Sequence, residues 1–226
     1  MNVAGAVLRL AGGVLLTVPS ALWTRGALSQ SGAAAVADSV RTDSVKRMVR
    51  SGLIPPGYGT LRQDDIAVQV QMLGLLVKLI PLEESVIRTL APDSYRALHA
   101  TRESKARQLD SIRTRLGLPA VQAWLVTLFN AEQGEARYDA SDVLVRSAGR
   151  DFRPLDYLPL KPGFGDGRLA QRESRSAMYV FDPAIDLSQP IAVTIGSQTN
   201  FAWNDIIQKI ERERSFVLSR ATAGKP

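Results

Sequence analysis

The sequence contains no cysteine and only one histidine, His99, in 226 residues. The absence of cysteine excludes disulfide bonds, thiolate metal sites, cysteine nucleophiles and a lipoprotein anchor. A single histidine excludes metal motifs that need two, and any histidine-based catalytic triad would have to use His99. The lack of cysteine and the single histidine therefore exclude several common catalytic and metal-binding chemistries.

Positive charge is only slightly in excess, with 28 lysines and arginines against 22 aspartates and glutamates and a formal net charge of +6. Two of the cations, Arg9 and Arg25, lie in or beside the apolar N-terminal segment. The most basic stretch, residues 96–115, has no interleaved aromatic residues and no known recognition motif. We therefore expect no nucleic-acid partner.

The N-terminal segment 3–23 is apolar, and its uncharged part, residues 10–23, has the length of a signal-peptide core. Ala27 and Ser29 are small residues at the −3 and −1 positions of a cleavage site. We interpret residues 1–29 as an export signal. If Arg9 snorkels, residues 3–23 are instead long enough to cross a bilayer as a retained anchor, and a buried soluble helix is the third alternative. The signal and the anchor both predict an extracytoplasmic protein, periplasmic or membrane-anchored and facing outward.

Residues 30–60 are interpreted as a linker that contains a short basic helix. The stretch DSVRTDSVKRMVRSG has a narrow apolar stripe and a basic opposite face, and Gly52 followed by Pro55-Pro56 ends it. Such a helix is typical of a solvated surface, and the alternative is that it lies against anionic lipid or a partner.

The remainder, residues 61–226, shows the alternation of β-strands separated by Gly, Pro and Asp. We predict one long strand over residues 66–80 with a bend at Gly74. A central strand over 121–130 follows, and then strands over 142–149, 151–160, 174–182 and 189–196. Pro154 and Pro159 indicate that the segment 151–160 lies at a sheet edge.

Two helical additions interrupt or close this β pattern. Residues 83–117 have helical spacing in two pieces divided at Pro92, and the second piece is rich in cations. A favourable i,i+4 pair is expected between Glu103 and Arg107. This basic face is either a solvated surface or a contact for an acidic protein or lipid; its candidate interaction residues are Arg96, Arg102, Lys105, Arg107 and Arg113. A closing helix is predicted over 200–221, capped by Thr199 or Asn200.

The order of elements resembles the immunoglobulin-like β-sandwich domains of uncharacterised bacterial exported proteins. The resemblance is carried by the strand 66–80, AWLVTLFN, DVLVRSAGRDFRPLDYLPL, the loop GFGDGRL and SAMYVFDPAIDL before QPIAVTIG. It implies a mainly β fold with helical additions, namely an antiparallel sandwich with an inserted two-piece helix and a C-terminal helix. Such domains are usually binding or scaffolding modules.

The remaining motifs give little support for catalysis. KPGFGDG is rich in glycine but lacks the GK[ST] of a phosphate loop, and strands flank it on both sides. No motif surrounds a serine that His99 could activate. Four carboxylates in one loop are candidate calcium ligands, although their spacing matches no EF-hand: Glu132, Glu135, Asp139 and Asp142. The aromatic residues Trp124, Trp203, Tyr157, Tyr179 and Phe181 are assigned to the core rather than to a sugar-stacking platform.

The leading functional hypothesis is an extracytoplasmic, non-catalytic module without a cofactor that binds a protein or cell-envelope component. One alternative is an accessory subunit of a larger membrane complex, held by residues 3–23. Another is an envelope hydrolase or carbohydrate-binding protein that uses the loops 132–142 and 163–186.

The export signal and the anchor predict different masses for the native protein. Cleavage after Ser29 removes about 29 residues, because signal peptides are cut from the mature chain. Intact-mass spectrometry of protein isolated from its own cells checks this. The full 24.6 kDa chain contradicts cleavage and agrees with a retained segment.

Overall fold

The computed structural model describes residues 53–72 and 74–223. The segments proposed as export signal, anchor and short basic helix lie outside these residues. The described residues belong to one compact unit, and no helix among them is long and apolar enough to cross a membrane.

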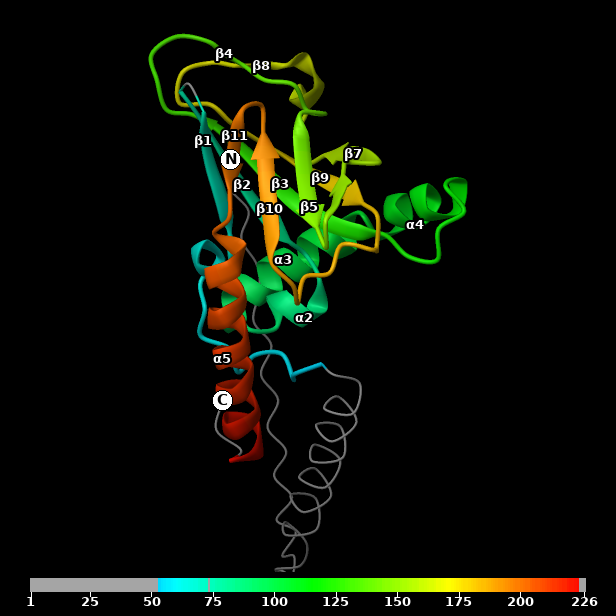
Figure 1. Cartoon of the computed structure of the whole chain (residues 1–226), viewed down its shortest axis with the longest axis vertical. Coiled ribbons are helices and arrows are strands. Elements are labelled where there is room, and N and C mark those ends of the chain that lie inside the picture. Colours follow the sequence, from blue (N-terminus) through cyan, green and yellow to red (C-terminus); the bar gives the residue numbers. More distant parts are fainter. Residues whose placement is uncertain (1–52, 73, 224–226) are drawn as a thin grey trace, which may run out of the picture. The chain divides into compact units, whose positions relative to one another are not determined.

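The larger sheet has five antiparallel strands in the order β1-β2-β3-β9-β7 (Figure 1). These strands are β1 (Val68–Met72), β2 (Leu75–Pro81), β3 (Gln122–Asn130), β9 (Ser174–Phe181) and β7 (Asp156–Pro159). The predicted central strand is β3, which pairs with β2 along one side and with β9 along the other. Its side chains Trp124, Val126 and Leu128 are buried, as expected for a strand inside a sheet.

A second sheet has four antiparallel strands in the order β11-β10-β5-β6. They are β11 (Gln198–Asn200), β10 (Ile191–Ile195), β5 (Val143–Ser147) and β6 (Arg150–Phe152). A two-stranded ribbon joins β4 (Ala136–Arg137) to β8 (Arg168–Leu169). The two larger sheets contribute to one hydrophobic cluster. The predicted class, mainly β with helical additions, is confirmed.

The segment 66–80 is a hairpin and not the single bent strand that its alternation predicts. Met72 of β1 pairs with Leu75 of β2, and Gly74 has φ +73° at the turn between them. Both arms place their apolar residues on the core-facing side, so the two-residue period shifts by one residue at the turn: Val68, Val70 and Met72 precede it, and Leu75, Val77 and Leu79 follow it. Such a shift is compatible with a bulge or a bend, and the positive φ of Gly74 favours the turn.

The segment 151–160 is also divided, into β6 and β7 on either side of Pro154. The predicted edge position is correct for both parts, because β6 and β7 are the last strands of different sheets. The edge at β7 offers few donors for another strand. The Tyr157 N–H donates to Asp156 Oδ1 at 2.8 Å, and Pro159 has no N–H.

The closing helix α5 (Trp203–Thr222) begins three residues later than predicted, because Asn200 belongs to β11. The Asn200 side chain accepts a hydrogen bond from the Ala202 N–H at 2.6 Å before the helix starts. The buried face of α5 carries Trp203, Ile206, Ile210 and Val217, which recur at the spacing of one helix face.

Glu213 also lies on this buried face, with 6 % of its surface exposed. Its Oε1 accepts hydrogen bonds from the backbone N–H and the hydroxyl of Thr60 at 2.9 and 3.0 Å. Arg220 donates to the same oxygen at 2.8 Å and also to the Tyr58 carbonyl at 2.7 Å. Glu213 therefore connects α5 to the segment that leads into the first strand.

Replacing Glu213 with alanine should lower the free energy of unfolding by about 1–3 kcal/mol, because the Thr60 and Arg220 donors lose their acceptor. Glu211→Ala is the matched control on the same helix. Glu211 is exposed and, among the described residues, pairs only with Arg214, so its loss should change stability by less than about 0.5 kcal/mol. Urea unfolding of both variants checks this, and equal effects contradict the structural role of Glu213.

Candidate functional site

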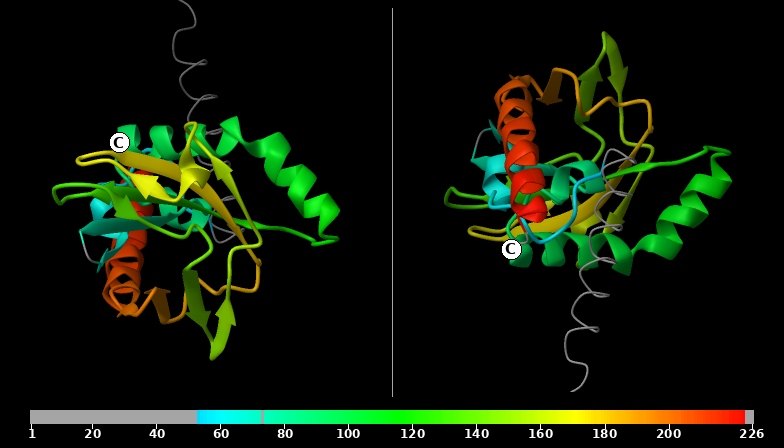
Figure 2. Two further views of the ribbon diagram at one scale, coloured as in Figure 1. Left: turned by 90° about the horizontal axis from the view of Figure 1, so that it is seen from above. Right: turned by 90° about the horizontal axis from the view of Figure 1, so that it is seen from below.

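The helical insert leaves and rejoins the larger sheet at one place. The Leu82 N–H donates to the Ala123 carbonyl at 2.8 Å, directly beyond the pair Pro81–Trp124 that ends the β2–β3 ladder. Three helices lie between these points: α2 (Glu84–Ile87), α3 (Pro92–Ser104) and α4 (Ala106–Arg115). Figure 2 shows α3 and α4 in green, with α4 extending away from the strands.

The division predicted at Pro92 is present, because α2 ends at Ile87 and Pro92 is the first residue of α3, where a proline needs no N–H partner. A second break, which the sequence did not predict, lies at Lys105 (φ −110°, ψ 5°). Because Lys105 separates α3 from α4, residues 103 and 107 do not face each other across one helical turn. The expected Glu103–Arg107 ion pair is absent between these two described residues.

The five candidate interaction cations fall into two groups. Arg96 pairs with Asp93 and Arg113 pairs with Asp110 on their own helices. Arg102, Lys105 and Arg107 surround the break, and none of them forms an ion pair with another described residue. A cleft of about 290 Å³ lies beside the break, between α4 and residues 119–121, and Arg102 and Arg113 are among its lining residues.

Glu83 and Arg102 link the insert to the start of β3. Burial raises the pKa of Glu83, and the nearby positive charge of Arg102 opposes that rise. The Ala123 N–H hydrogen-bonds the Glu83 carboxyl group. Among the described residues, Glu83 Oε1 and Arg102 Nε are buried without a hydrogen-bond partner, an arrangement with a cost in free energy.

The only histidine joins a polar cluster at the base of the insert. His99 Nδ1 lies 2.9 Å from Glu84 Oε1, and the Tyr95 ring stacks on the imidazole with centroids 5.3 Å apart. Burial of Glu84 opposes its ionisation, but hydrogen bonds from Arg88 and His99 outweigh it and lower the pKa of Glu84. Within residues 53–72 and 74–223, no serine or threonine hydroxyl contacts His99, so the cluster is not a nucleophilic triad.

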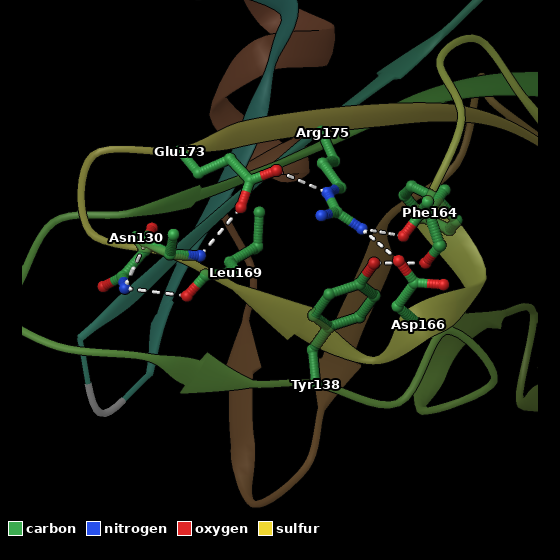
Figure 3. Close-up of polar contacts among 9 residues, drawn as sticks. Asn130, Tyr138, Phe164, Asp166, Leu169, Glu173 and Arg175 are labelled. Atoms are coloured by element: carbon green, nitrogen blue, oxygen red, sulfur yellow. Dashed lines mark hydrogen bonds and ion pairs between the residues drawn. The ribbon is translucent and has the colours of Figure 1, made fainter.

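The two acidic loops considered for a sugar or hydrolase site do come together, because β4 pairs with β8. Arg175 holds the second loop: it donates to Glu173 Oε1 at 2.6 Å, to Asp166 Oδ2 at 3.1 Å and to the Gly163 carbonyl (Figure 3). Gly163 has φ +81°, and a side chain there would collide with the Arg175 guanidinium. Sequence reasoning missed Arg175, since no local pattern marks it.

Asn130, at the end of β3, contacts both acidic loops. Its side-chain amide donates to the Leu169 carbonyl at 3.2 Å (Figure 3). The amide also donates to the Gly134 carbonyl at 2.8 Å, while the side-chain oxygen accepts from the Glu132 N–H. Asn130 is 1 % exposed, so these bonds replace the water that its amide would otherwise bind.

The four candidate calcium ligands do not converge in this arrangement. Glu132 lies beside Gly74, Glu135 pairs with Arg168 at 3.7 Å, and Asp139 accepts both the N–H and the hydroxyl of Ser141. In the part of the chain that the structure describes, no three histidine or acidic side chains form a group that could hold a metal ion.

The predicted core aromatics are buried with one exception. Trp124, Trp203, Tyr179 and Phe181 are at most 1 % exposed, whereas Tyr157 is 36 % exposed on the edge strand β7. Tyr157 borders a cleft of about 260 Å³, which is also lined by Tyr138, Asp139, Ala140, Phe164, Gly165 and Gly167.

The sequence matches no known protein family and no curated protein. Among solved structures, a functionally unknown protein from Listeria monocytogenes EGD-e is similar over 56 % of this chain and 68 % of its own. The identity is 11 % and the TM-score 0.31.

Glu83 and Glu84 should give opposite pH dependences of stability. Because the pKa of Glu83 is raised above 4.5 in the folded chain, the folded state keeps a proton that the unfolded chain has lost, and stability falls as pH rises through this window. The lowered pKa of Glu84 gives stability that is present above 4.5 and lost as pH falls through the folded value.

Glu83→Gln should therefore gain stability relative to the parent chain between about pH 4 and about pH 7, whereas Glu84→Gln should lose it over the same range. Urea unfolding at both pH values measures the two differences. Slopes of the same sign for the two variants contradict the assignment.

Proposed function

We propose that this protein is an extracytoplasmic, non-catalytic binding or scaffolding module with an immunoglobulin-like arrangement of its sheets. In this proposal it contacts an acidic surface of a partner protein through the helical insert. The immunoglobulin-like assignment is supported by the exclusively antiparallel pairing of the larger sheets and by the core that they share.

The observation that carries the proposal is the set of three cations, Arg102, Lys105 and Arg107, around the helix break. Many other charged side chains of the described residues serve the fold, as Glu213 and Arg175 do. Lys105 and Arg107 form no ion pair with another described residue, and Arg107 is exposed, whereas Arg102 lies near the buried carboxyl group of Glu83. Cations in this setting attract an acidic surface and increase the rate of encounter with it.

A protein surface is favoured over lipid by the apolar residues at the end of the insert. Arg115 forms an ion pair with Asp156 at 2.5 Å, and the neighbouring residues Leu116 and Leu155 are each 41 % exposed. Cations beside exposed leucines match the mixed composition of a protein interface. The adjacent edge of β7 is not the docking element in this proposal, because Tyr157 and Pro159 offer no free N–H for an added strand.

Reversing two of these charges tests the proposal. Lys105→Glu with Arg107→Glu should reduce recovery of the partner by about tenfold when the full chain is purified from its native membranes after crosslinking. Arg102 is left unchanged because it balances Glu83 inside the molecule.

The matched control is Arg153→Glu with Lys161→Glu. These residues are exposed, form no ion pair with other described residues and change the net charge equally. The proposal requires that the control keep the partner. Equal recovery from both double variants, or equal loss, overturns it.

A further inference from the structure

The cleft beside β7 is a site of a different kind from the insert. Its volume is about 260 Å³, and its lining comes from three separate segments: residues 138–140, Tyr157 of β7 and the loop 164–167. We propose that this cleft binds one ring of a neutral glycan, with the sugar stacked on Tyr157. The proposal does not depend on the partner of the insert.

The walls of the cleft are held in place before any ligand arrives. The Tyr138 hydroxyl donates to the Phe164 carbonyl (Figure 3). The Tyr138 N–H donates to the Gly167 carbonyl at 2.9 Å. Phe164 is fully buried beneath the cleft, with its ring centroid 5.7 Å from those of both Tyr138 and Tyr157. A preformed wall of this kind lowers the entropy cost of binding.

The chemistry of the lining fits a ring that carries hydroxyl groups. Tyr157 offers a partly exposed aromatic surface for the C–H groups of a sugar, and its own hydroxyl has no partner among the described residues. Hydrogen bonds from Ser141 lower the pKa of Asp139, so its carboxylate is ionised and accepts hydrogen bonds from hydroxyl groups.

The charge of the lining disfavours anionic ligands. Among the described residues that border the cleft, Asp139 is the only charged one and none is a lysine or arginine. A quaternary ammonium would match Asp139 and the aromatic rings, but it has no donors for the polar groups around them. A neutral polyhydroxylated ring uses both the aromatic surface and the polar groups.

Gly165 gives an independent reason to regard the cleft as a site. Its φ is outside the left-handed region, and an added Cβ would meet only the Tyr157 hydroxyl, at 3.9 Å. Neither backbone conformation nor packing requires glycine here, in contrast to Gly163. The missing side chain keeps the cleft open next to Tyr157.

Ligand-observed NMR titration of the full chain tests the proposal, with cellobiose, chitobiose and maltose as probes. At least one disaccharide should show saturation transfer to its ring protons, and Tyr157→Ala should weaken that binding about tenfold. Gly165→Val should have a similar effect by filling the cleft. Thermal unfolding of each variant verifies that it is folded.

Phe201→Ala is the control, because Phe201 is 62 % exposed and does not line the cleft. It should leave sugar binding unchanged. The proposal is overturned if none of the three disaccharides binds, if binding persists in both cleft variants, or if tetramethylammonium binds at Tyr157 and the sugars do not.

Discussion

Strand β3 is the element on which the rest of the described structure depends. It pairs with β2 and β9 along its two sides, and its Trp124 contacts both Phe181 of β9 and Trp203 of α5, with ring centroids 5.5 and 6.3 Å apart. The larger sheet and the closing helix therefore meet at one buried side chain. Because a buried strand must pair its backbone on both sides, the position of β3 determines where its neighbours begin and end.

The two candidate sites attach to opposite ends of this strand. At its start, Leu82 and Ala123 close the helical insert, and Glu83 accepts the Ala123 N–H. At its end, Asn130 binds the carbonyls of the two loops that border the aromatic cleft. Both additions thus leave the sheet where its ladder stops, and neither interrupts a strand pair. An insertion closed in this way costs little stability, since the sheet supplies the closure.

Charged residues divide into those that hold the fold and those that face outward. Glu213 and Arg175 each bind several groups, and both are largely shielded from water. Lys105 and Arg107 form no ion pair with another described residue. A charge that the fold does not use is the better candidate for contact with another molecule.

Much of the fold could be predicted from local patterns of apolar and polar residues in the sequence. The two-residue alternation of the strands, the helical spacing after residue 83 and the apolar stripe of α5 are properties of short stretches, so they predicted the mainly β class and its helical additions. The edge position of residues 151–160 followed from its prolines, which remove donors wherever they occur. The basic face of the insert was likewise visible as a run of cations.

The tertiary structure decided which segments of the chain contact one another. The hairpin at Gly74, the division at Pro154 and the break at Lys105 depend on which segments pair and pack, which local periodicity does not specify. The pairing of Glu84 with His99 joins two helices, and the contacts of Arg175 join a strand to the loop before it. The cleft brings together Tyr138, Tyr157 and Gly165 from three segments. Such contacts depend on the free energy of the whole core, which no single segment of the sequence determines.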